Sequence, residues 1–141
     1  MRGTGIMLTL ALLFMGLPFS SRAQNIALIG ENDADVFVPI GKYIQQGDAE
    51  SLSAWFADNL EMTILGKSND CCSKSQAKEI MQAFFDANHP HKFEIIHKSG
   101  ENIMRHAIGR LYCTQNNYSI TVTVLIGEKG NHIQILKIEN N

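Results

Sequence analysis

The fold is decided by the stretch DVFVPIGKYIQQGDAESLSAWFADNLEMTIL, residues 35–65. Its first half predicts a helix, because Asp35 can accept hydrogen bonds from the free amides of a first turn and apolar residues follow at helical spacing. Gly47 ends this helix, since glycine enters a left-handed conformation without strain, and Asp48 caps the next helix.

The second half of this stretch predicts a short helix followed by a strand. The helix has an apolar stripe at one-turn spacing, formed by Leu52, Trp55 and Phe56, and Asp58-Asn59 breaks it. Apolar and polar residues then alternate over residues 60–64, which is typical of a strand with one buried face. A helix pair that leads into a strand favours an α+β domain over a helix bundle.

The remaining chain predicts one long helix and four strands. Residues 66–72 are expected to form a turn or loop, and Ser73 with Gln76 forms a capping box that opens a helix over residues 73–88. Short turns separate the strand patterns at 91–98, 102–114, 118–126 and 132–139, which indicates an antiparallel meander. We therefore predict an α+β fold in which three helices from the N-terminal half pack on a curved antiparallel sheet, in the order α-α-β-α-β-β-β-β.

The N-terminus has the features of a secretory signal peptide. Arg2 precedes an uncharged apolar run over residues 6–19, and Ser21-Arg22-Ala23 places small residues where a signal peptidase reads them. About 14 apolar residues are fewer than the roughly 20 that span a membrane, so we expect cleavage after Ala23 and no stable membrane anchor. The protein is thus expected to be exported to the periplasm or the extracellular space.

Length and charge indicate one acidic domain. The chain has 141 residues and a formal net charge of −2, and cleavage after Ala23 would remove two arginines and no acid. This charge argues against nucleic acid as a partner. We expect a signal peptide at 1–23, a loose lead at 24–34 and a single domain at 35–141, with no cofactor.

Several of these segments resemble a known family. The stretch at residues 36–70, KSQAKEIMQAFFD at 74–86 and IQILKIE at 133–139 are similar to domain-of-unknown-function family 4783. The resemblance implies small exported bacterial proteins with the cystatin-like cone of the nuclear transport factor two superfamily and no established activity. This superfamily also holds ketosteroid isomerase and the polyketide cyclases, and its members often dimerise through the back of the sheet.

An isomerase or cyclase needs an inward carboxylate as its base. Tyr43 lies roughly where the resemblance places an isomerase tyrosine, but the first strand offers only Glu61, on the side opposite its apolar face. His106, Arg110 and Tyr112 share one strand face, and they bind a polar ligand if that face looks into the cone or are solvated if it looks out.

Metal and cysteine chemistry have weaker support. His89 and His91 are spaced as HxH, but a metal site needs further ligands, and we expect no metal here. Adjacent Cys71 and Cys72 seldom bridge each other. One of them could bridge Cys113, with Cys72 as the candidate; the alternatives are a thiolate favoured by the helix N-terminus and thiols without a role.

The apolar stripes suggest a pocket inside the cone. It would bind a lipophilic small molecule and would be lined by Tyr43, Trp55, Phe56, Met62, Phe84, Met104, His106, Arg110 and Tyr112. Adjacent apolar pairs such as Ile135-Leu136 place apolar residues on both sheet faces, so we also expect a homodimer through the outer face. The predicted function is a non-catalytic small-molecule-binding or protein-interaction module of the cell envelope; the alternative is an enzyme of the isomerase or cyclase type.

Overall fold

A computed structural model describes residues 35–141, except for the side chains of residues 69–71. The described elements are, in chain order, α4 (Phe37–Gln46), α5 (Ala49–Ser53), β2 (Phe56–Ile64), β3 (Lys67–Ser73), α6 (Lys74–Asn88), β4 (Pro90–Glu101), β5 (Met104–Cys113), β6 (Asn117–Gly127) and β7 (Gly130–Asn140). The predicted signal peptide at 1–23 and the lead at 24–34 lie outside the described residues.

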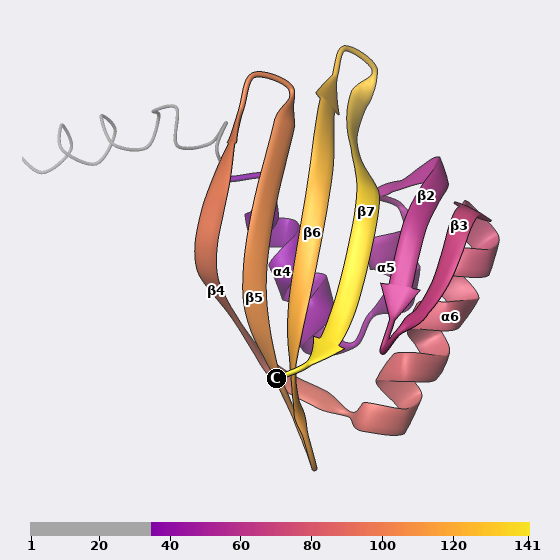
Figure 1. The fold of residues 1–141 in the computed structure, drawn as a ribbon, viewed down its shortest axis with the longest axis vertical. Helices are drawn as coiled ribbons and strands as arrows, with labels where there is room; N and C mark the ends of the chain where they lie inside the picture. The colour runs from indigo at the N-terminus through magenta and orange to yellow at the C-terminus, as the bar shows by residue number, and fades with distance from the viewer. Residues whose placement is uncertain (1–34) are drawn as a thin grey trace, which may run out of the picture. The chain divides into compact units, whose positions relative to one another are not determined.

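The strands form one curved sheet in the order β3-β2-β7-β6-β5-β4 (Figure 1). Neighbouring strands are antiparallel except β2 and β7, which run parallel. The predicted α+β architecture, with its three helices in the N-terminal half and its late antiparallel meander, is confirmed.

Two local predictions were wrong. Residues 67–73 form the edge strand β3 instead of a loop, because they pair with β2 as a hairpin. Phe56 opens β2 instead of continuing the second helix, which ends at Ser53, so Asp58 and Asn59 lie inside a strand. In both places, pairing with a neighbouring strand decides the structure over local sequence preference.

Helix α4 forms where its apolar spacing predicts. Phe37, Ile40 and Ile44 recur on one side and are buried. Gly47 ends the helix with φ 68°, and its N–H donates to the carbonyl of Ile44 at 3.1 Å. The left-handed conformation explains why glycine stands there.

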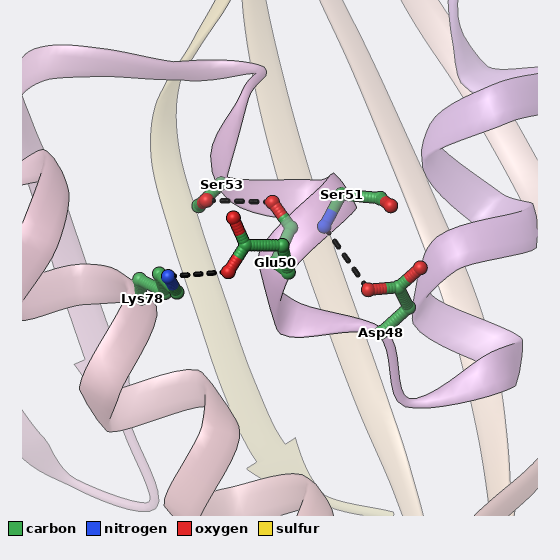
Figure 2. A network of polar contacts seen from close by, with 5 residues as sticks. All are labelled: Asp48, Glu50, Ser51, Ser53 and Lys78. Carbon is green, nitrogen blue, oxygen red and sulfur yellow. Dashed lines mark hydrogen bonds and ion pairs between the residues drawn. The ribbon is translucent and has the colours of Figure 1, made fainter.

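Helix α5 is short and is held by polar contacts at both ends (Figure 2). The Asp48 carboxylate accepts from the Ser51 N–H at 3.0 Å, and the Ser53 hydroxyl donates to the Glu50 carbonyl at 2.7 Å. The Glu50 carboxylate forms an ion pair with Lys78 of α6, as Figure 2 shows. Five residues are too few for an autonomous helix, so these contacts and its buried side chains position α5.

Helix α6 has the predicted capping box. The Ser73 hydroxyl accepts from the Gln76 N–H at 3.2 Å, and the Gln76 side chain accepts from the Ser73 N–H at 3.0 Å. Its buried stripe consists of Ala77, Met81, Phe84 and Phe85. The helix ends at His89, which adopts a left-handed φ of 51°.

The two faces of the sheet differ in cover. Figure 1 looks onto the face that the described helices leave open, with α4 and α5 behind it. Helix α4 packs on β4 and β5, and α6 packs on β2 and β3. The covered face carries buried aliphatic residues: Ala107, Leu111, Ile120, Val122, Val124, Ile133, Leu136 and Ile138. Among the described helices, none has the length and apolar character required to cross a bilayer.

The Phe93 ring, which lies between Gly109 and Gly41, shows which side of β5 the helices cover. The Phe93 ring of β4 lies so close to Gly109 that a Cβ there would overlap the ring, and a Cβ on Gly41 of α4 would lie 3.2 Å from it. Gly109 therefore faces the helices, as do the buried Ala107 and Leu111. The even-numbered residues of β5 consequently point to the opposite side.

Candidate functional site

We define the open face as the side of the sheet away from the described helices. It includes the even-numbered residues of β5, from Met104 to Tyr112. Their cross-strand partners on β6 share this side, because directly opposed residues in an antiparallel pair point the same way. These pairs are Met104–Leu125, His106–Thr123, Ile108–Thr121, Arg110–Ser119 and Tyr112–Asn117. The next strand adds Ile135 opposite Thr123 and Lys137 opposite Thr121.

An apolar hollow of about 420 Å³ lies on the open face, at the end of the sheet where the β4–β5 and β6–β7 turns are found. Its apolar lining consists of Leu60, Met104, Leu125 and Ile135, and its polar lining consists of Asn59, Glu61 and Gln134. The register shifts between β2 and β7 and between β6 and β7 in this region. Such irregularities bend strands and re-aim side chains, which accounts for a hollow at this place in the sheet.

A histidine–threonine pair lies next to this hollow. The His106 Nδ1 atom and the Thr123 Oγ1 atom are 3.0 Å apart, and Thr123 is buried although it points to the open face. Either atom can donate, depending on the histidine tautomer. The contact fixes the imidazole ring beside Met104 and Ile108, so the middle of the face has one positioned polar group among apolar ones.

The opposite end of the open face is polar. The Tyr112 hydroxyl donates to the Glu94 carboxylate at 3.2 Å, and the Lys92 Nζ lies 5.2 Å from the centre of the Tyr112 ring. Arg110 stands between Glu94 and Ser119, and its Nε is buried without a hydrogen-bond partner among the described residues. A buried orphan donor is costly, so this guanidinium has an unused capacity to bind an acceptor.

The structure does not bring the nine predicted pocket residues together. Phe56, Met62 and Phe84 are buried, while Tyr43 and Trp55 are half-buried on α4 and in the turn before β2. The other four lie on the open face: Met104, His106, Arg110 and Tyr112. The sheet separates these four from the core, because β5 turns its small residues toward the helices and the Phe93 ring.

The cysteines are free thiols in the described part of the chain. Cys72 and Cys113 are both buried, and the disulfide considered between them is not formed. Cys72 lies beside the first turn of α6, whereas Cys113 pairs with Pro90, just beyond the last turn of that helix. The two cysteines are therefore at opposite ends of α6, and a helix of this length spans about 22 Å. Burial raises the pKa of both thiols, which opposes the thiolate that a helix N-terminus would favour at Cys72.

Two further candidate sites remain without supporting geometry. His89 and His91 are exposed at the α6–β4 junction, and the described residues contain no group of three or more side chains suited to hold a metal ion. Glu61 borders the hollow on the open face, and the Tyr43 hydroxyl has no hydrogen-bond partner among the described residues. Among the described residues, no hydrogen bond links Tyr43 to a carboxylate.

One buried polar contact was missed by the sequence reasoning. The Tyr118 hydroxyl donates to Asn88 Oδ1 at 2.6 Å, and the Asn88 amide donates to the Phe84 carbonyl at 2.8 Å. The Tyr118 ring also meets the Phe84 ring edge-on, with the centroids 5.1 Å apart. A tyrosine on the apolar side of an alternating strand could have suggested such a partner, because buried hydroxyls require one.

Comparisons with known proteins agree with this fold. The family model described as "Domain of unknown function (DUF4783)" matches residues 37–139. No curated protein matches the sequence.

Three crystal structures are similar to this chain at low identity. A DUF4783 family protein from Bacteroides uniformis is 20% identical, with 75% of this chain and 97% of that chain covered and a TM-score of 0.71. A cystatin-like domain of unknown function from Nostoc punctiforme is 12% identical, with 79% and 76% covered and a TM-score of 0.61. An NTF-2-like protein of unknown function from Silicibacter pomeroyi is 13% identical, with 81% and 100% covered and a TM-score of 0.61. These matches confirm the cystatin-like, nuclear transport factor two-like fold.

Proposed function

Because the chain belongs to the DUF4783 family of domains of unknown function, we propose a function from the geometry of its sheet: a non-catalytic interaction module of the cell envelope that forms a homodimer through the open face. The observation that supports this is the apolar hollow on that face, lined by Leu60, Met104, Leu125 and Ile135. Polar residues, Asn59, Glu61 and Gln134, border these apolar side chains. An exposed apolar patch bordered by polar residues is typical of a protein–protein interface.

A second copy of the chain is the occupant that this face fits best. The open face carries both signs of charge near its polar end, with Arg110 and Lys137 beside Glu94 and Glu139. A twofold interface brings a surface against itself, so such a mixture lets acidic groups of one copy meet basic groups of the other. The buried Nε of Arg110 would find its acceptor in the same way. The envelope location rests on the signal-peptide pattern at residues 1–23.

The test is a charge placed in the hollow. Leu125→Arg would put a long charged side chain into the apolar surface that two meeting open faces must bury, and we expect the dimer dissociation constant to rise by at least about 100-fold. Sedimentation equilibrium between 1 and 200 micromolar, roughly spanning weak to tight association, measures this. Ala83→Arg is the matched control, because Ala83 is exposed on α6 and should leave association unchanged.

Two results would overturn the proposal. One is a parent protein that sediments as a monomer across the whole range. The other is an equal loss of association in Leu125→Arg and Ala83→Arg. Circular dichroism of each variant establishes that a lost dimer is not an unfolded chain.

A further inference from the structure

Strand β4 is the outermost strand at one end of the described sheet, and α4 lies alongside it. A groove of about 340 Å³ runs between them, with Phe37, Val38 and Lys42 on the helix side and Phe93 and Ile95 on the strand side. We infer that this groove binds an extended peptide of a partner protein, which adds to β4 as a further strand. The peptide would have apolar residues at alternate positions and a carboxylate at one end.

The backbone of β4 supplies the first element of this site. The Phe93 N–H donates to the Gln45 side-chain oxygen at 2.8 Å, so it points away from β5. Because hydrogen-bonding directions alternate along an antiparallel strand, the N–H and C=O of Ile95 point to the same outer edge. In the described sheet no strand lies on that edge. Because Gln45 already binds the Phe93 N–H, the N–H and C=O of Ile95 are the groups through which the edge would add a strand.

The groove walls supply the specificity. Val38 is 61% exposed on α4, and Ile95 is half-buried on β4. Side chains of an added strand alternate between the two faces of the sheet, so every second one would enter the groove and contact these residues. β-Branched or aromatic residues at those positions would bury the exposed valine and also favour the extended conformation.

Charge supplies the orientation of the peptide. Lys42 is the charged residue that lines the groove, and it is exposed. Glu94, which lies between the two groove residues of β4, belongs to the open face, where it meets Tyr112. A carboxylate near one end of the peptide would therefore be attracted to Lys42 and would set the direction of the added strand.

The experiment uses the full mature chain and two synthetic peptide pools. In both pools, valine, isoleucine or phenylalanine alternates with threonine; one pool ends in glutamate and the other in lysine. Amide hydrogen exchange of β4 is the readout. We expect the glutamate pool at saturation to slow exchange at Ile95 by about tenfold or more, since a new main-chain hydrogen bond closes that amide. The lysine pool should bind at least tenfold more weakly.

Two variants make the inference falsifiable. Lys42→Glu should reverse the preference between the pools, whereas the matched Lys129→Glu in the β6–β7 hairpin should not. Leu125→Arg should leave peptide binding intact, which separates this site from the proposed dimer face. The inference is overturned if neither pool protects β4, if Lys42→Glu leaves the preference unchanged, or if the Ile95 amide is already protected in the protein alone.

Discussion

At the scale of single residues, packing volume determines which side chains are available for function. Sequence periodicity shows that His106, Arg110 and Tyr112 share a face of β5, but it cannot show which face, because apolar residues stand on both sides of that strand. The deciding fact is the position of Phe93, a residue of another strand, whose ring requires Gly109 beside it. A contact between residues far apart in the chain therefore settles what alternation alone leaves open.

The packing of the Phe93 ring against Gly109 gives a prediction at the residue scale. Gly109→Ala should lower the free energy of unfolding by about 1–3 kcal/mol, because the new methyl group overlaps the Phe93 ring and the ring must shift toward α4. Urea unfolding followed by the fluorescence of the single tryptophan, Trp55, measures the change.

The matched background for this test is Phe93→Ala. There the ring is absent, so adding Gly109→Ala should cost nearly nothing, and the two changes should be strongly coupled. An equal cost of Gly109→Ala in both backgrounds would show that the strain lies elsewhere, for example against the Glu94 carbonyl 3.1 Å away.

At the scale of elements, the local signals that predicted correctly are caps and turns. Asp48, the Ser73–Gln76 box and Gly47 all occupy their predicted roles, because each acts through hydrogen bonds or dihedral angles within a few residues. Strand β3 was missed since its sequence, KSNDCCS, lacks β-branched residues. It is a strand because it pairs with the edge of β2. This pairing depends on a neighbouring strand, so the sequence of residues 67–73 alone does not predict it.

The Asp48 cap gives a prediction about pH. Hydrogen bonds from the Ser51 backbone and side chain lower the pKa of Asp48 below its ordinary value of 3.8. A carboxyl whose pKa is lower in the folded state contributes stability that is present above its unfolded pKa and is lost as the pH falls through the folded pKa. The parent should therefore lose this stabilisation below about pH 4, while Asp48→Asn, which keeps the acceptor without the charge, should not.

Urea midpoints between pH 6 and pH 2, roughly the range over which carboxylates titrate, measure this difference. We expect the difference in urea midpoint between the parent and Asp48→Asn to be constant near neutral pH. In acid, the midpoint of the parent should fall relative to that of the variant. Asp48→Ala is the control, because it removes the acceptor and should be destabilised by about 1 kcal/mol at neutral pH. A gap that does not change with pH would contradict the role of the charge.

In the molecule as a whole, one face of the sheet is buried in the core and the other face is open to a partner. The helices and the inner face of the sheet bury the apolar core, and an apolar hollow lies on the open face and a groove lies beside the β4 edge. The sequence was sufficient for the α+β fold and the family resemblance, because both follow from patterns along the chain. It was insufficient for the site, since the predicted pocket joined residues that the sheet holds on opposite sides.

Export of the protein across the inner membrane is a further prediction. The unit that holds the described helices and strands spans Phe37–Asn141, so cleavage after Ala23 would remove none of its residues. When the full chain is expressed in a Gram-negative host, the envelope fraction should contain a protein whose mass corresponds to an N-terminus at Gln24. Ala23→Phe should accumulate precursor, because signal peptidases require a small residue before the cleaved bond. Ala27→Phe is the matched control, since it adds the same ring beyond that bond and should leave processing intact. Intact mass spectrometry distinguishes these products, and an envelope protein that retains Met1 would count against both the signal peptide and the proposed location.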